Sequence, residues 1–335
     1  MDEPIYRDML ADVAAMYYLR EMTQEQIARA VGVSRVKVHR MLKEAREARV
    51  VEITIHRSWP RDRRLEAALV SHFGLREVFV LQTSGLDDAS IWRGIGEIGA
   101  RRLETLVKDD STIAVCLGRS TYQVVQAVRS GLRRRVRVAQ ALGSVPFATP
   151  ELDSATLARQ LATRLGGEVL YLPSPMLADS PEATEVLRRQ PDIERTLSAA
   201  ASADVALVGI GNLDPAHWRL ATAAGLTPEE LAEMASTGAV GDIAGLIFTE
   251  EGHLHRNELT DRVIGLTLDE LRRIGTVFAV AFGSAKARAI VGTLRTGVVD
   301  VLCTDDNAAG EALRIAGSAL AARCPKGASS LRCNA

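Results

Sequence analysis

The sequence predicts an α/β protein in two parts: an N-terminal winged helix-turn-helix domain and a larger, Rossmann-like domain built on a mainly parallel sheet. Two observations predict this division. Positive charge is concentrated near the N-terminus on short segments with helical apolar spacing, and eight strand-like apolar runs alternate with amphipathic stretches further along. A chain of 335 residues, 47% of them hydrophobic, is long enough for about two domains with sizeable cores.

Two helices are predicted before residue 33. Residues 5–20 form the first, since their apolar side chains recur at helical spacing. Thr23 then suits an N-cap, and Gln26 at the third helical position completes a capping box. Gly32 ends the second helix, because a tight turn between helices favours a residue that accepts positive φ at low cost. The predicted apolar faces consist of Met9, Val13, Met16 and Tyr17 in the first helix and Ile27, Ala28 and Val31 in the second.

A third helix begins after Ser34, which suits its N-cap, and its predicted buried stripe consists of Val38, Met41 and Leu42. In a helix-turn-helix, the second helix of the pair enters the major groove of DNA by its N-terminal residues. Arg35 and Lys37 are therefore candidates to contact guanine edges. The candidates to hold phosphates are Arg40, Lys43 and Arg46. The predicted DNA-binding residues are Thr23, Ser34, Arg35, Lys37, His39, Arg40 and Lys43.

The distribution of charge supports this prediction. Between residues 33 and 64, ten Lys or Arg stand against four acids, a net charge of +6, whereas the whole chain has a net charge of −1. A helix exposed to water needs no such bias, but a helix beside phosphates does. The alternative is a helical hairpin with a solvated basic face; the agreement of caps, turn glycine, apolar spacing and charge favours double-stranded DNA as the partner. One such unit makes few base contacts, so we expect pairing through the larger domain.

The predicted boundaries follow from changes in pattern along the chain. Residues 50–55 alternate like a strand and predict a small wing, and the charged, proline-bearing segment that follows predicts a linker. The predicted parts are a DNA-binding domain at 1–55, a linker at 56–64, an effector-binding and oligomerisation domain at 65–318, and a disordered tail at 319–335.

The larger domain is predicted to hold a parallel sheet covered on both faces, because continuous apolar runs are followed by amphipathic helices such as residues 153–165. The strand-like runs are 78–82, 112–117, 136–142, 168–173, 204–211, 246–249, 277–283 and 298–304. In such sheets, ligands bind beyond the carboxyl ends of the strands, where loops meet helix N-termini.

Several of these strand ends carry groups that suit a ligand. Residues 118–121 place a glycine, an arginine and two hydroxyls at a helix N-terminus, which suits a phosphate or another anion. Glycines within 209–212 allow close backbone approach, and Gly283 and Lys286 lie at another helix start. Each glycine also permits a tight turn without any ligand, but several in one sheet favour a pocket.

At these residues the chain resembles the SorC family of bacterial transcriptional regulators, from about residue 5 to about residue 318. The resemblance is most specific in GAVGDIAGLIF at 238–248, DRVIGLTLDELRRI at 261–274 and AKARAIVGTLRTGVVDVLCTD at 285–305. It implies a helix-turn-helix joined to a sugar-binding domain similar to sugar-phosphate isomerases and deaminases. It also implies a homotetramer and a sugar, sugar phosphate or sugar alcohol as effector.

The resemblance implies an effector site at the matching positions, with informative departures. Leu117 stands where the family often has tryptophan, and Leu246 and Phe282 replace a frequent arginine and glycine. These changes favour a sugar alcohol or a singly phosphorylated sugar over a strongly phosphorylated effector. The loop around Gln140 lacks the lysine through which some members bind an aldehyde, so no Schiff base is predicted there. The predicted effector-binding residues are Gly118, Arg119, Ser120, Thr121, Gly143, Ser144, Gly209, Gly211, Asn212, Asp242, Gly283 and Lys286.

Other classes of protein fit the sequence poorly. The segment MDEPIYRDML is acidic and has no apolar core typical of a signal peptide, and no run reaches the roughly 18 apolar residues of a spanning helix. The four cysteines have neither metal-ligand nor disulfide-framework spacing. His253 and His255 lack a third partner at ligand spacing, so no metal and no other cofactor is predicted. We expect a cytoplasmic protein.

Three functions are compatible with these patterns. The favoured one is a DNA-binding regulator of a carbohydrate or polyol operon, acting as a repressor or activator under control of the effector and not as an enzyme. The second is a sugar-phosphate isomerase or deaminase with a DNA-binding appendage, in which Asp242 and Lys286 would be the acid and base candidates. The third is a structural DNA-binding protein without an effector, which the glycine-rich strand ends disfavour.

Overall fold

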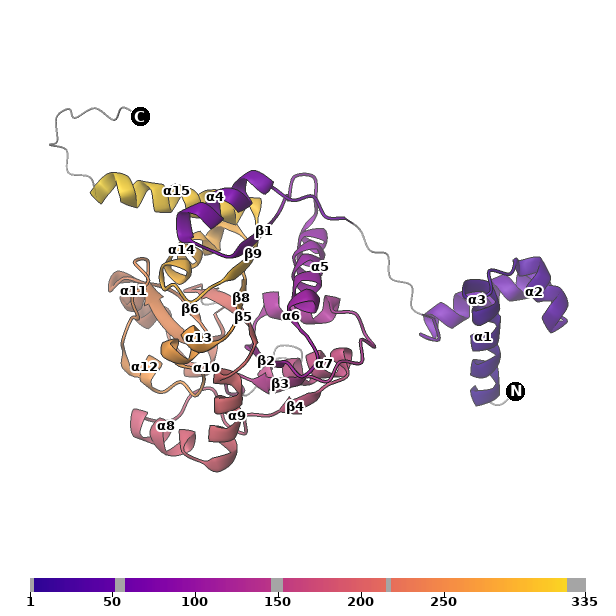
Figure 1. The fold of residues 1–335 in the computed structure, drawn as a ribbon, viewed down its shortest axis with the longest axis horizontal. Helices are drawn as coiled ribbons and strands as arrows, with labels where there is room; N and C mark the ends of the chain where they lie inside the picture. The colour runs from indigo at the N-terminus through magenta and orange to yellow at the C-terminus, as the bar shows by residue number, and fades with distance from the viewer. Residues whose placement is uncertain (1–2, 52–57, 146–152, 215–217, 324–335) are drawn as a thin grey trace. The chain divides into compact units, whose positions relative to one another are not determined.

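The computed structural model describes residues 3–51, 58–145, 153–214 and 218–323. Contacts divide the chain into a small unit, Met1–Ser58, and a large unit, Trp59–Ala335. Each unit has its own hydrophobic core. Figure 1 shows the helices and strands of both units.

The small unit consists of three helices: α1 Glu3–Tyr18, α2 Gln24–Val31 and α3 Arg35–Glu47. Thr23 and Gln26 form the predicted capping box on α2, Gly32 ends this helix at φ 71°, and the Ser34 hydroxyl accepts a hydrogen bond from the Lys37 amide. These predictions from local sequence are confirmed. The unit's buried apolar side chains are Leu10, Val13, Ala14, Ile27, Ala28, Val38, Met41, Leu42 and Ala45.

Two predictions about the small unit differ from the structure. The buried face of α1 is centred on Val13 with its neighbours Leu10 and Ala14, so Met9 and Met16 lie only at its border. Val50 and Val51, the first residues of the predicted wing, follow α3 without forming a strand. The remainder of that wing lies outside the described residues.

The large unit is built on a sheet whose strand order is β1-β9-β8-β5-β2-β3-β4, with every neighbouring pair parallel. An antiparallel hairpin, β6–β7, extends from β5. The mainly parallel sheet is confirmed, but β6 was not expected as a strand, since Gly241 and Asp242 have low strand propensity. The strands are β1 Glu77–Leu81, β2 Thr112–Val115, β3 Arg137–Gln140, β4 Glu168–Leu170, β5 Val205–Asn212, β6 Ala239–Ile243, β7 Leu246–Thr249, β8 Val277–Val280 and β9 Val301–Asp305.

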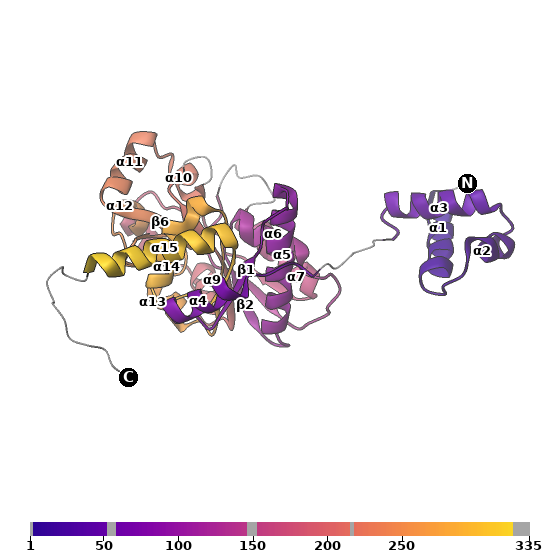
Figure 2. The ribbon, with the colours of Figure 1, turned by 90° about the horizontal axis from the view of Figure 1, so that it is seen from above.

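Helices cover both faces of this sheet, as the alternation of apolar side chains requires. Val78 and Val80 of β1 join one core cluster, and Leu81 joins the other. Figure 2 shows α5, α6 and α7 on one side and α4, α9, α13, α14 and α15 on the other. The helices are α4 Arg63–Phe73, α5 Asp88–Leu106, α6 Arg119–Ala127, α7 Ser154–Leu165, α8 Pro181–Arg188, α9 Pro191–Ala201, α10 Arg219–Ala224, α11 Pro228–Ser236, α12 Glu258–Asp261, α13 Leu268–Arg273, α14 Ala287–Arg295 and α15 Asp306–Arg323, with a 3₁₀ turn η1 at Ser284–Lys286.

The large unit begins earlier than predicted, because residues assigned to the linker at 56–64 are bound to it. The Trp59 indole nitrogen donates to Glu97 Oε2 of α5 at 2.9 Å. Arg61 bridges to Leu81 of β1 and forms an ion pair with Glu66 at 2.6 Å. Packing and hydrogen bonds therefore order residues 59–62, and α4 starts directly after them.

The opposite end of the large unit also differs from the prediction of a disordered tail at 319–335. Helix α15 continues to Arg323, so the first five of these residues are helical. The rest of the predicted tail, with Cys324 and Cys333, lies outside the described residues. The two cysteines that are described, Cys116 and Cys303, are buried and free.

Candidate functional site

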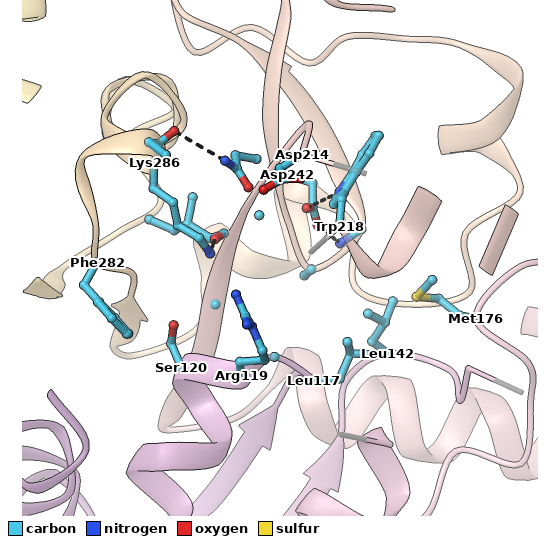
Figure 3. A pocket seen from close by; sticks show the side chains of 18 of the residues that line it. Leu117, Arg119, Ser120, Leu142, Met176, Asp214, Trp218, Asp242, Phe282 and Lys286 are labelled. Atoms are coloured by element: carbon cyan, nitrogen blue, oxygen red, sulfur yellow. Dashed lines mark hydrogen bonds between the residues drawn. The ribbon is translucent and has the colours of Figure 1, made fainter. Parts of the chain in front are cut away.

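A cavity of about 310 Å³ lies at the carboxyl ends of β2, β5 and β8, with the β6–β7 hairpin along one side. This is the edge at which an open α/β sheet binds ligands. Figure 3 shows side chains from these strand ends, from the start of α6 and from η1 around the cavity.

Eight of the twelve predicted effector-binding residues line this cavity. They come from three separate strand ends and the hairpin, which the fold brings together. They are Gly118, Arg119, Ser120, Gly209, Gly211, Asn212, Asp242 and Lys286. Two of the departures from the family pattern, Leu117 and Phe282, also line it, whereas Leu246 is buried in the core instead.

Two predicted residues lie next to the cavity but support its walls. The Thr121 side chain is fully buried, and its hydroxyl is within hydrogen-bond distance of the carbonyls of Cys116 and Gly118, at 3.1 and 2.8 Å. The Gly283 amide donates to Asp305 Oδ1 at 3.1 Å, and its φ of 90° suits glycine. Both residues fix loop geometry, which the sequence pattern did not distinguish from ligand contact.

Gly143 and Ser144 lie at a different place, in the loop after β3. A Cβ on Gly143 would lie 2.1 Å from the Pro175 carbonyl oxygen, so close packing of two loops requires glycine here. Ser144 lines a shallow second depression, together with Gln140 and Tyr171. Their assignment to the main cavity is therefore corrected.

A half-buried lysine lies at the polar end of the cavity. Lys286 Nζ donates to the Ile210 carbonyl oxygen at 2.5 Å, so the end of β5 holds its ammonium group. Burial lowers the pKa of Lys286 to about 8, and the nearby Arg119 charge acts in the same direction, whereas Asp242 and Asp214 oppose the shift. Asn212 Nδ2 donates to the Ala285 carbonyl at 3.3 Å and ties β5 to η1.

Asp242 lies on β6 and faces the same cavity. Its Oδ1 accepts from the Trp218 indole at 2.6 Å, and its Oδ2 accepts from the Gly245 amide at 3.0 Å. Burial raises the pKa of Asp242, while both hydrogen bonds and the Lys286 charge favour its ionised form. A Cβ on Gly211 would lie 1.9 Å from Asp242 Oδ1, so glycine is needed where β5 passes this carboxylate.

The remaining wall is apolar and includes residues that the sequence did not indicate. Trp92, from the first turns of α5, stacks edge-on against Phe282 with ring centroids 4.4 Å apart. The Arg119 guanidinium lies 5.2 Å from the Trp92 ring centroid. Leu142 and Met176 complete this side. Trp92 and Trp218 carried no recognisable signal, because neither lies in a glycine-rich strand end.

The small unit presents its predicted DNA-binding residues on α2 and α3. Arg35, His39, Arg40 and Lys43 are exposed, and Lys37 is half-buried. Arg40 pairs with Glu44 at 3.5 Å and Lys43 with Glu47 at 3.7 Å, each one turn along the same helix. Thr23 and Ser34 are the N-caps of α2 and α3, so their hydroxyls lie at the N-termini of these helices. In a helix-turn-helix, the N-terminal end of the second helix is the part that faces the bases.

Histidines and acids do not gather into a metal site in the part of the chain that the structure describes. His255 instead contacts Thr237 Oγ1 through Nε2 at 2.9 Å and Asn257 Nδ2 through Nδ1 at 3.2 Å. Within the described residues, every helix is too short or too polar to cross a bilayer.

Residues 59–314 match a family model described as "Putative sugar-binding domain". The transcriptional regulator LsrR of Enterobacter sp. (strain 638) is 30% identical over 316 residues, which are 92% of this chain and 94% of that protein. The deoxyribonucleoside regulator of Bacillus subtilis (strain 168) is 29% identical over 300 residues, 89% of this chain and 95% of the relative.

Solved structures show the same similarity. The full-length sorbitol operon regulator SorC from Klebsiella pneumoniae has a TM-score of 0.71 at 27% identity and covers 93% of this chain and 99% of its own. A structure from Vibrio fischeri described as "Putative Sugar-Binding Domain of Transcriptional Repressor" has a TM-score of 0.69 at 29% identity, covering 76% of this chain and 100% of its own. The similarity therefore extends over both units.

Proposed function

Because this chain belongs to the SorC family of transcriptional regulators, we propose that it controls a carbohydrate or polyol operon by binding a small polyhydroxyl effector in the cavity of its large unit. Its relatives are regulators rather than enzymes, and the isomerase or deaminase alternative is therefore set aside. The observation that carries this proposal is the convergence of Arg119, Asp242 and Lys286 on one cavity in a chain that also has a helix-turn-helix.

The cavity's chemistry supports an effector with one anionic end and several hydroxyls. Arg119 and Ser120 lie at the start of α6, where backbone amides and the helix dipole favour an anion. Asp242 and Asn212 offer acceptors and donors to hydroxyl groups at the other end. A volume of about 310 Å³ suits a monosaccharide-sized molecule. A singly phosphorylated sugar has both the anionic end and the hydroxyl groups. A sugar alcohol has the hydroxyl groups but would make no anionic contact with Arg119.

DNA binding is assigned to the exposed side of α3, whose cations would lie against phosphates and base edges in the major groove. Since one such unit covers a single half-site, we propose that the large units pair the chains, as a homotetramer. A half-site spacing of about one helical turn or a multiple of it would follow.

Coupling between the two activities is assigned to α5. This helix contributes Trp92 to the cavity wall and, five residues later, Glu97, which holds the Trp59 indole where the large unit begins. An effector that moves Trp92 would move α5 and with it the first residue after the small unit. A coupling of about 1–3 kcal/mol, a 5–150-fold change in DNA affinity, is enough for a switch.

The test combines two measurements on the full chain. A thermal-shift panel of sugars, polyols and their monophosphates identifies ligands that stabilise the protein. Operator affinity is then measured with and without each hit. We expect at least one hit to change DNA affinity fivefold or more. Stabilisation by no carbohydrate, or a hit that leaves DNA affinity unchanged, would contradict the proposal.

A further inference from the structure

An apolar side chain stands among the charges of the predicted recognition helix. Val36, the second residue of α3, is 79% exposed. Among the described residues, the other exposed large apolar side chains are Leu19, Tyr171 and Val186, of which Leu19 alone is exposed to a similar degree, 82%. Single exposed apolar side chains are common on protein surfaces, so exposure alone does not indicate a partner. The position of Val36 among the cations of the predicted recognition helix does.

The geometry of α3 puts Val36 at the centre of its outward face. The buried stripe consists of Val38, Met41, Leu42 and Ala45. At 100° per residue, Val36 lies nearly opposite the middle of this stripe. His39, Arg40 and Lys43 follow it at the i+3, i+4 and i+7 positions and therefore share its face. Arg35 and Lys37 lie to either side, and Lys37 is accordingly half-buried.

The surroundings of Val36 indicate a polyanion as the partner of this face. Two cations flank it along the helix, and residues 33–64 carry a net charge of +6. The apolar group that DNA offers in the major groove is the 5-methyl of thymine. Valine is stiff at χ1 in a helix, so its two methyls would meet that group at little cost in side-chain entropy.

We infer that Val36 contacts the 5-methyl group of a thymine in each half-site of the operator and is a specificity-determining residue. The inference rests on the proposed DNA-binding function. It adds an apolar base contact to the polar base contacts predicted for Arg35 and Lys37.

The experiment uses the full-length chain and chemically altered DNA. Duplexes that bind best are selected from a random pool, and each thymine of the selected site is then replaced by deoxyuridine, which removes only the methyl group. Loss of one buried methyl contact weakens binding about fourfold. We expect this loss at one thymine per half-site with the unaltered protein. We expect no loss at that thymine with Val36→Ala, a substitution that favours the helix and leaves the buried stripe intact.

Leu19→Ala is the matched control, because it removes the other strongly exposed apolar side chain of the small unit. This variant should retain the fourfold dependence on the methyl group. Uracil tolerated at every thymine, or equal sensitivity in Val36→Ala, would overturn the inference while leaving sequence-selective binding intact. A chain that binds selected and random duplexes equally would overturn the proposed function itself.

Discussion

The outward face of α3 and the cavity at the strand ends hold charge in opposite ways. On α3, the cations stand in water, and their acidic partners lie one turn away on the same helix. In the cavity, the carbonyl of Ile210 holds Lys286 from a distant strand. Asp242 is held by the indole of Trp218, from another part of the chain, and by the amide of Gly245 in its own hairpin. Exposed ion pairs contribute little to stability and are screened by salt, whereas buried charges depend on every partner. The first surface suits a repeating polyanion, and the second suits one ligand of defined shape.

The largest effect is expected from Asp242→Ala. This change removes the carboxylate that accepts from the Trp218 indole and the Gly245 amide, and of the two carboxylates near Lys286 it leaves only Asp214. The free energy of unfolding of the large unit should fall by about 2–6 kcal/mol, because each of the two donors that loses its acceptor costs about 1–3 kcal/mol. Calorimetry checks this, with Glu185→Ala as control, because the exposed pair of Glu185 with Arg189 contributes less than about 1 kcal/mol. Equal stability of the two variants would remove the contrast between the regions.

The next effect concerns Arg40→Ala on α3. Loss of one phosphate contact should weaken DNA binding about tenfold for all sequences alike and reduce the salt slope by about 1 per protomer. Effector affinity should not change. Arg189→Ala, which removes the same charge from the large unit, is the control and should alter neither quantity. A sequence-dependent loss would show that Arg40 contacts a base instead.

A pH effect is expected from the cavity. Since the pKa of Lys286 is about 8, its charge is lost as pH rises through this value, and affinity for an anionic effector should fall about eightfold between pH 7.5 and 9. Lys286→Gln should flatten this profile, and a neutral polyol should not show it in either protein. The unfolded lysine keeps a pKa near 10.5, so unfolding takes up a proton between pH 8 and 10.5. Over that window Lys286 makes stability rise with pH, a slope that the variant should lose.

The smallest effect is expected from Trp59→Phe, which keeps an aromatic ring but removes the donor to Glu97. Effector affinity without DNA, and DNA affinity without effector, should stay within about twofold. The factor by which effector changes DNA affinity should fall about threefold. Tyr171→Phe is the control, because it also removes one polar atom from an aromatic side chain, but at an exposed position outside α5. This variant should leave the effect of effector on DNA affinity unchanged.

The same contrast explains how far the sequence could predict the structure. Caps, the turn glycine and the buried stripe of α3 depend on neighbours within four residues, and they were predicted. Helical spacing also places Val36 on the outward face of α3, a position that the distribution of charge alone does not indicate. Seven of the eight cavity residues could be predicted because glycine-rich strand ends mark a binding edge, and Asp242 was indicated by the resemblance to the SorC family.

The residues that were missed or misplaced depend on distant packing. Trp92 reaches the cavity from a helix that precedes β2, and Trp218 does so through a hydrogen bond to Asp242. Gly143 looked like a ligand contact, but the need for glycine there comes from Pro175, more than thirty residues away. Local pattern cannot separate a glycine that admits a ligand from one that admits another loop.

Close packing along α5 has a thermodynamic consequence. Gly96 and Gly99 let this helix approach α6, since a Cβ at these positions would lie 2.7 Å from the Gln123 carbonyl oxygen and 2.5 Å from Val124 Cγ2. Trp59 packs against Gly94 on the same helix. If these contacts couple the effector cavity to the DNA-binding unit, the coupling is reciprocal. Binding of operator DNA would then alter the affinity for sugar by the same factor by which sugar alters the affinity for operator DNA. A promoter-bound protein would therefore respond at a different metabolite concentration from the one free in solution.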